Sequence, residues 1–205
     1  MNPIARFQLW SLRANLDLAQ QSLDRGDVAE SIRRFEVDLK MRRKVLAKVH
    51  DPQLRALGEL DAARAALALA WLYQREEVHD RLAAVARYAY DTYRANGRLE
   101  QAGLAAILFA GASGALGRRD ESGSMLRENY DELVAACPDA EITVTIGQSF
   151  ANNLLARQEY DAAEPVIAAS RKRAARVHGP ESYQVRQHDR LADRVRAGRD
   201  QASER

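Results

Sequence analysis

The sequence predicts an all-α protein built from repeated helical hairpins. Alanine accounts for 37 of the 205 residues and aromatic residues for only 6%, a composition that favours helices over strands. Apolar residues recur with the helical period of about 3.6 along almost every segment. Turn-forming residues interrupt this pattern at similar intervals, so the predicted helices have similar lengths.

The predicted helices follow one another from the N-terminus, and a recognisable break ends most of them. In the first helix, apolar residues at spacings of three and four form one stripe: Leu9, Leu12, Leu16, Ala19 and Leu23. Glycine, or the residue before a proline, leaves the right-handed helical region and so ends a helix. The breaks lie at Gly26, His50–Pro52, Gln74–Glu76, Asn96–Gly97, Gly117–Asp120, Cys137–Asp139, Arg157–Glu159 and His178–Pro180. They divide the chain into nine helices of about 16 to 24 residues.

Two segments are harder to assign. Gln74–Glu76 contains neither glycine nor proline, so we place this turn near Arg75. Ile142–Ile146 is rich in β-branched residues, but the run is short and a helical apolar pattern follows it. We therefore interpret it as part of a helix.

The turns inside the predicted hairpins recur with a nearly constant period. They fall at Gly26, near Arg75, at Gly117 and at Gln158, with spacings of about 49, 42 and 41 residues. Short turns force consecutive helices to be antiparallel neighbours. A final amphipathic helix, Glu181 to Ala197, would cover the apolar face of the last hairpin, as helical repeat arrays require.

One stretch carries a resemblance to a known family. The run Glu159–Val166 (EYDAAEPV), followed by Arg173–Glu181 (RAARVHGPE), resembles the tetratricopeptide repeat (TPR) of about 42 residues found in kinesin light chains. Gln158 stands where the family has glycine, and the strong resemblance covers residues 143–181. It implies a TPR-like α-solenoid of about four helical hairpins plus a C-terminal capping helix. Residues 1–198 would form a single domain and residues 199–205 a polar tail.

The same resemblance implies a non-catalytic scaffold that binds a protein or peptide in a concave groove. In the family, ligand-facing positions lie six and ten residues before the hairpin turn. The predicted groove residues are Leu16, Gln20, Leu69, Ile107, Gln148 and Asn152, with Ala65 and Gly111 at the remaining equivalent positions. This groove would be apolar with a polar end, which suits an amphipathic or apolar peptide. Alternatively, Leu16, Leu69 and Ile107 are core residues.

No catalytic, metal or cofactor motif is evident in the sequence. The four histidines lack zinc-ligand spacing, and the single cysteine, Cys137, has no partner for a disulfide. Gly111–Gly117 is glycine-rich but lacks the lysine of a phosphate-binding loop. We therefore expect no cofactor and no enzyme activity. A regulator that senses a peptide or nucleic acid, and a small-molecule-binding or enzymatic protein, remain the alternatives.

Charge is unevenly distributed along the chain. Residues 1–50 carry +4, residues 51–164 carry −7 and residues 165–205 carry +5. This pattern leaves self-association into a homo-oligomer open, whereas solvated helix faces explain the basic stretches better than nucleic acid does. The longest apolar run, Ala65–Tyr73, is too short to span a membrane, and no signal peptide is recognised. We expect a cytoplasmic protein, and the few lysines among the basic residues suggest a bacterial source.

Overall fold

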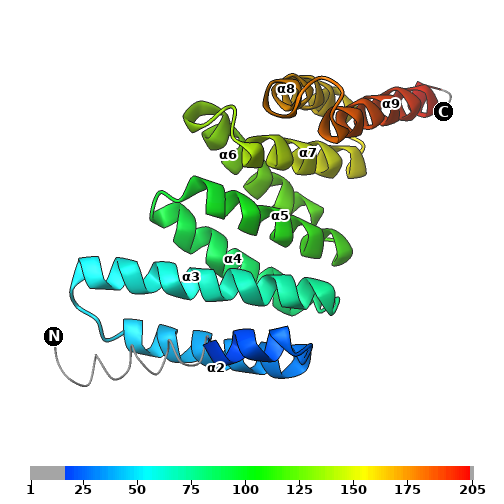
Figure 1. Ribbon diagram of the computed structural model, residues 1–205. Coiled ribbons are helices and arrows are strands. Elements are labelled where there is room, and N and C mark those ends of the chain that lie inside the picture. The colour runs from blue at the N-terminus through cyan, green and yellow to red at the C-terminus, as the bar shows by residue number, and fades with distance from the viewer. Residues whose placement is uncertain (1–16, 204–205) are drawn as a thin grey trace. The chain divides into compact units, whose positions relative to one another are not determined.

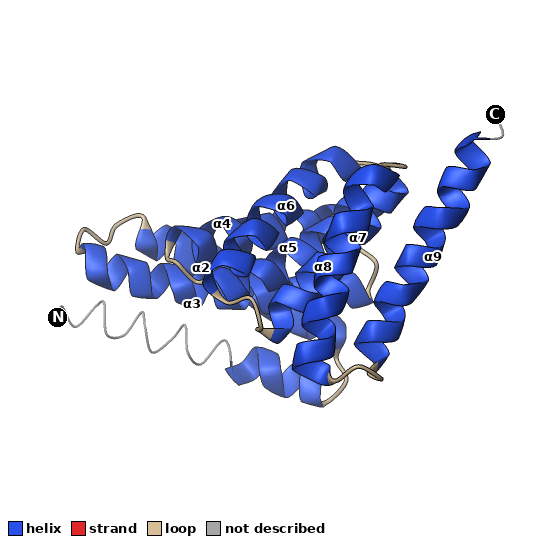
Figure 2. Cartoon of the chain, turned by 90° about the horizontal axis from the view of Figure 1, so that it is seen from above, coloured by secondary structure: helices blue, strands red, loops and turns tan. Residues whose placement is uncertain are grey.

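A computed structural model describes residues 17–203, and α-helices dominate this part of the chain (Figures 1 and 2). The described residues contain no strand, which confirms the all-α prediction, and Ile142–Ile146 is helical. Residues 17–24 are helical, and eight further helices follow: α2 (Val28–Leu46), α3 (Pro52–Arg75), α4 (His79–Ala95), α5 (Leu99–Ala115), α6 (Arg119–Ala136), α7 (Glu141–Ala156), α8 (Tyr160–His178) and α9 (Tyr183–Ser203).

Helix starts are set by local capping where the sequence provides an aspartate. The Asp27 carboxylate accepts a hydrogen bond from the backbone N–H of Glu30 at the start of α2. Asp51 accepts from Gln53 and Leu54 at the start of α3, where Pro52 occupies the first turn. These contacts satisfy backbone donors that have no partner within the helix.

The four hairpin turns share one backbone geometry. The residues with a left-handed backbone at these turns are Gly26 (φ 79°), Glu77 (φ 56°), Gly117 (φ 75°) and Gln158 (φ 61°), which we call the turn residues. The N–H of the residue after each one donates to a carbonyl five residues back, for example Asp27 to Ser22 and Glu159 to Leu154. This pattern is the Schellman motif, which satisfies the last carbonyls of a helix. The turn predicted near Arg75 therefore lies two residues later, at Glu77.

The chain divides into two compact units, Met1–Gly97 and Arg98–Arg205, which we call unit 1 and unit 2. In unit 1, α3 packs against both α2 and α4. Alanines supply much of the buried surface of α3, and the Glu36 carboxylate joins the three helices by accepting hydrogen bonds from Tyr73 and Arg81. A second carboxylate, Asp38, is fully buried in α2 and pairs with Arg42 at 2.6 Å.

In unit 2, α7 is the central helix. It packs against α5, α6, α8 and α9. The odd-numbered helices α5, α7 and α9 thus follow one another in one layer, and α6 and α8 pack against that layer. Small residues permit the close approach: a Cβ added at Gly147 of α7 would lie 2.1 Å from Ser170 Oγ of α8.

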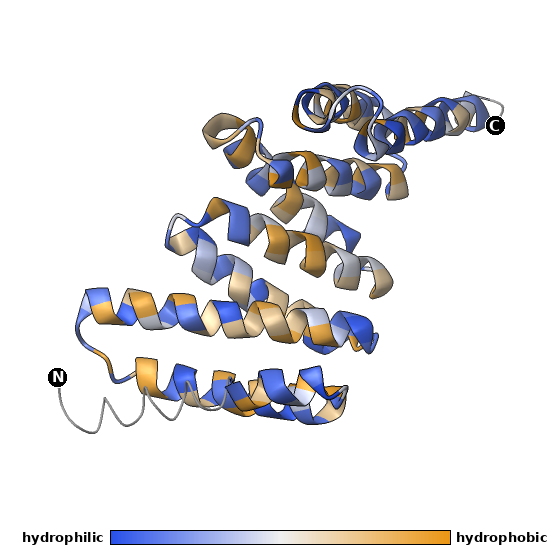
Figure 3. Ribbon diagram, in the orientation of Figure 1, coloured by the Kyte–Doolittle hydropathy of each residue, from blue (hydrophilic) through white to orange (hydrophobic). Residues whose placement is uncertain are grey.

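Helix α9 closes the C-terminal end of unit 2. Its buried residues Val185, His188, Leu191 and Val195 face α7 and α8, while the rest of the helix is polar (Figure 3). The helix continues to Ser203, so residues 199–203 are helical, and the assignment of residues 199–205 to a polar tail stays a prediction. Within this last part of α9, Arg199 bridges to Asp161 at 2.7 Å and to Glu164 at 2.8 Å on α8.

None of the described helices is long and apolar enough to cross a membrane. The prediction of a single repeat domain over residues 1–198 stays a prediction.

Candidate functional site

The turn residues fix which positions are equivalent in the four hairpins. Counting back six and ten residues gives Gln20 and Leu16, Trp71 and Leu67, Gly111 and Ile107, and Asn152 and Gln148. In the second hairpin the prediction is corrected, because the turn residue is Glu77 rather than Arg75, and Leu69 and Ala65 are therefore not at the equivalent positions. Trp71 takes the place of Leu69, and 52% of its surface is exposed. Leu67 takes the place of Ala65 and is half-buried.

Leu69 is a core residue of unit 1. Only 1% of its surface is exposed, and its side chain lies at the bottom of a hollow between α2, α3 and α4. The alternative reading of Leu69 as core is the correct one, and Ala65 is buried as well. Gln20 is exposed and donates to Asp24 at 2.9 Å, whereas Leu16 lies outside the described residues.

The remaining predicted residues lie on the α5 and α7 layer of unit 2. Ile107 on α5 and Gln148 and Asn152 on α7 are half-buried. The Asn152 side-chain amide donates a hydrogen bond to the backbone carbonyl of Gln148 at 3.1 Å. Gly111 is exposed, and a Cβ added there would meet no atom within 4 Å. This surface therefore combines an apolar, small-residue part with an amide-bearing part.

Arg194 of α9 belongs to the same surface, although it is not among the groove residues predicted from the sequence. Its guanidinium donates to Asn152 Oδ1 at 2.9 Å. Arg194 follows Asn152 by 42 residues and Arg190 follows Gln148 by 42 residues, which is the repeat length. That spacing is the signal in the sequence that indicates these two residues, whereas the apolar stripe of the last helix indicates only a cap. We call Ile107, Gly111, Gln148, Asn152, Arg190 and Arg194 the open face of unit 2.

A buried histidine lies on α9, the helix that carries Arg190 and Arg194. His188 is fully buried, and its Nδ1 lies 2.7 Å from the Gln184 carbonyl oxygen. Burial lowers the pKa of His188, because removing the ring from water disfavours its charged form. The hydrogen bond to the Gln184 carbonyl and, to a smaller extent, the nearby Asp189 carboxylate oppose this effect, and the Arg171 guanidinium adds to it.

The described residues contain no cluster of three or more His, Cys, Asp or Glu side chains placed to hold a metal ion. Cys137 is half-buried. The expectation of no cofactor and no catalytic residue stays a prediction.

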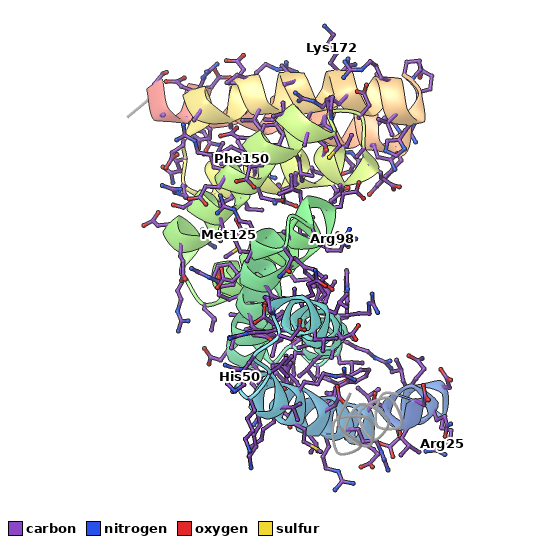
Figure 4. The ribbon with its side chains drawn as sticks, turned by 90° about the vertical axis from the view of Figure 1, so that its left-hand side faces the viewer. Arg25, His50, Arg98, Met125, Phe150 and Lys172 are labelled. Carbon is purple, nitrogen blue, oxygen red and sulfur yellow. The ribbon has the colours of Figure 1, made fainter. Side chains whose placement is uncertain are left out.

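Two hollows are lined by residues that do not belong to the open face, and they lie at equivalent places of the repeat in the two units. The unit 1 hollow, of about 450 Å³, lies between α2 and α4 above Leu69 and Tyr73 of α3. The unit 2 hollow, of about 440 Å³, lies between α6 and α8 above Phe150 and Leu154 of α7. Each pair lies eight and four residues before its turn residue. Figure 4 shows Phe150 among the packed helices, whereas Lys172 of α8 points outward.

Comparisons with known proteins support the fold. No protein-family model matches the sequence, and no curated protein is similar enough to count as a relative. Among solved structures, BtubC (BKLC) from P. vanneervenii aligns over 99% of this chain and 93% of its own, with 13% identity and a TM-score of 0.54.

A second solved structure, from Podosopora anserina, is described as a putative kinesin light chain with nearly identical TPR-like repeats. It aligns over 94% of this chain and 96% of its own, with 18% identity and a TM-score of 0.54. The chain therefore has the TPR-like, kinesin-light-chain-type fold that Glu159–Val166 predicted, and it is a helical repeat protein.

Proposed function

We propose that the protein is a non-catalytic scaffold that binds a protein or peptide through the open face of unit 2. The observation that carries this proposal is the contact between Arg194 and Asn152. It adds an exposed guanidinium to a layer that already offers a side-chain amide and an exposed glycine. Exposed polar groups beside a small apolar surface suit a peptide, which supplies both backbone carbonyls and apolar side chains.

The chemistry of the face indicates how a peptide would bind. An apolar side chain of the peptide would pack on Ile107 and over Gly111, where no side chain stands in the way. Peptide carbonyl or carboxylate oxygens would accept hydrogen bonds from Arg190 and Arg194, which are both exposed. The groove has no lysine at these positions, so the positive charge comes from α9.

The alternative function, nucleic-acid binding, is less well supported, because the arginines of the basic stretch of α8 are engaged by other side chains of the protein. Arg171 pairs with Asp189 at 2.5 Å, Arg176 pairs with Asp139 at 2.5 Å, and Arg173 donates to the Tyr130 hydroxyl at 2.9 Å. Guanidiniums engaged in this way are less available to phosphates. A cytoplasmic location and a bacterial source remain parts of the proposal.

Affinity capture tests the proposal. The wild type, a triple variant Gln148→Ala, Asn152→Ala, Arg194→Ala and a matched control Lys172→Ala, Arg196→Ala, Gln201→Ala would be compared in lysate of the cells that make the protein. The control changes three exposed polar residues outside the open face. Circular dichroism would first show that all three proteins are folded.

We expect a protein captured by the wild type and the control to be lost from the triple variant. Equal capture by all three proteins would contradict the assignment of the open face.

A further inference from the structure

The unit 1 hollow has an apolar floor. Leu39 of α2 and Leu69 of α3 are 8% and 1% exposed, and Val85 of α4 is half-buried beside them. Tyr73 adds its ring to this floor. The volume of about 450 Å³ leaves room for aliphatic side chains of a bound peptide.

The rim of this hollow carries uncompensated positive charge. Its one carboxylate, Glu36, is engaged by the Tyr73 hydroxyl and by Arg81, whose guanidinium lies 2.8 Å away. Burial and the hydrogen bond to Glu36 raise the pKa of Tyr73 to about 12, so the phenol keeps its proton at neutral pH.

Lys40 and Arg43 complete the rim, and both are exposed. Within residues 17–203, neither is paired with a carboxylate, and Arg43 lies over the Tyr88 ring at 5.0 Å. The hollow and its edge thus carry three cations, of which only Arg81 is paired with the one carboxylate, Glu36.

The equivalent hollow of unit 2 shows that this charge is not a general property of the repeat. Its floor is also apolar, with Phe150, Leu154 and Val166 at the positions of Leu69, Tyr73 and Val85. Its cations, however, are neutralised. Arg157 lies 3.1 Å from Asp120 and 2.7 Å from Glu159, and Arg127 lies 4.0 Å from Asp131.

We propose that the unit 1 hollow is a second docking site, separate from the open face, for an acidic peptide segment with an aliphatic anchor. The anchor would pack on Leu39, Leu69 and Val85, and flanking carboxylates would pair with Lys40 and Arg43. The positive charges of Lys40 and Arg43 favour an acidic peptide as the occupant, because charges at the rim of a site steer association and select the partner. A single-stranded nucleic acid fits less well, since the Tyr73 ring is only 3% exposed and offers little surface for base stacking.

Fluorescence anisotropy with the full chain tests this site. The probe is a fluorescein-labelled peptide with two leucines flanked on each side by three glutamates, and a second probe carries glutamine in place of every glutamate. The rim variant is Lys40→Gln, Arg43→Gln. The matched control, Arg127→Gln, Lys172→Gln, also removes two positive charges but leaves the unit 1 hollow intact.

We expect the acidic probe to bind the wild type and the control, and the rim variant to bind it about tenfold more weakly or worse. Binding should weaken as salt is added, and the glutamine probe should not compete.

Three results would overturn the proposal: no saturable binding of the acidic probe, equal weakening in the control, or displacement of the probe by a single-stranded oligonucleotide. Thermal unfolding monitored by circular dichroism separates a loss of binding from a loss of folding. Because the open face is intact in the rim variant, lysate capture through that face should be unchanged, which keeps the two proposals independent.

Discussion

At the residue scale, two turn residues adopt a backbone conformation that glycine favours. Glu77 and Gln158 have positive φ values of 56° and 61°, where Gly26 and Gly117 stand in the other two hairpins. An L-residue with a Cβ pays an energetic penalty in this region that glycine avoids. The absence of glycine at Glu77 also explains why the sequence placed the second turn two residues too early and selected Leu69.

We expect Glu77→Gly and Gln158→Gly each to raise the free energy of unfolding by about 1 kcal/mol, since the strain outweighs the greater freedom of glycine in the unfolded chain. Urea denaturation measures this change. The opposite substitution, Gly117→Ala, should lower stability by a similar amount, because a Cβ there meets no atom within 4 Å and only the backbone conformation opposes it. If all three variants had the same free energy of unfolding as the wild type, the turns would carry no strain.

Two glycines within helices should respond oppositely to alanine. At Gly147 an added Cβ would lie 2.1 Å from Ser170 Oγ and 2.9 Å from the Tyr130 ring, whereas at Gly111 it would meet nothing within 4 Å. We expect Gly147→Ala to destabilise the protein by about 1–3 kcal/mol through overpacking, and Gly111→Ala to stabilise it by about 0.5–1 kcal/mol through helix propensity. Thermal and urea unfolding of the two variants provide the measurement. A stabilising Gly147→Ala would mean that close packing does not hold α7 and α8 together at this position.

At the element scale, α9 has two roles, and the sequence analysis predicted one of them. The apolar stripe of residues 185–195 indicated a cap, and Val185 at the start of this stripe is buried in one cluster with Val144 of α7 and Ala174 of α8. The contribution of Arg194 to the open face depends on which side of α9 meets α7, which the apolar stripe alone did not specify. Likewise, Leu69 lies eight residues before the turn residue Glu77, which is the buried position that Phe150 occupies before Gln158. The residues around Leu69 in the sequence do not reveal this.

The docking of α9 should depend on pH through His188. Its folded-state pKa lies below the ordinary value of 6.5, so the unfolded chain takes up the proton first as the pH falls. The stability that neutral His188 contributes is therefore complete above about pH 6.5, falls as the pH decreases through 6.5, and levels off below the folded-state pKa. Asp189 and Arg171 are the charged groups that influence this titration.

Urea denaturation from about pH 7.5 down to about pH 5 would compare the wild type with His188→Leu and with His50→Gln as control. We expect the wild type to lose stability relative to His188→Leu as the pH falls below about 6.5, because only the wild type carries the buried histidine. The His50→Gln control should follow the wild type. A difference that is independent of pH would show that His188 titrates normally in the folded protein.

At the scale of the whole molecule, the sequence predicted the fold class and the positions of three of the four hairpin turns. Periodicity and glycine at Gly26 and Gly117 were sufficient there, because they report local backbone preferences. The TPR motif at Glu159–Val166 identified the fold that the solved structures share. The proposed binding surfaces were harder to predict from the sequence. They combine residues of separate helices, and local sequence patterns do not specify how those helices contact one another. Lys40 and Arg43 illustrate this, because only packing against α3 and α4 makes them the rim of a hollow.

Site-specific photo-crosslinking would reveal whether a partner binds at the open face. The photoreactive residue p-benzoylphenylalanine would replace Ile107 on the open face in one protein and Lys172, on an exposed part of α8, in another. Both proteins would be irradiated in the cells that produce them, and the products would be identified by mass spectrometry. We expect one protein partner to be crosslinked from Ile107 and to be absent from Lys172. No crosslinked protein at Ile107, or the same products from both positions, would contradict partner binding at this face.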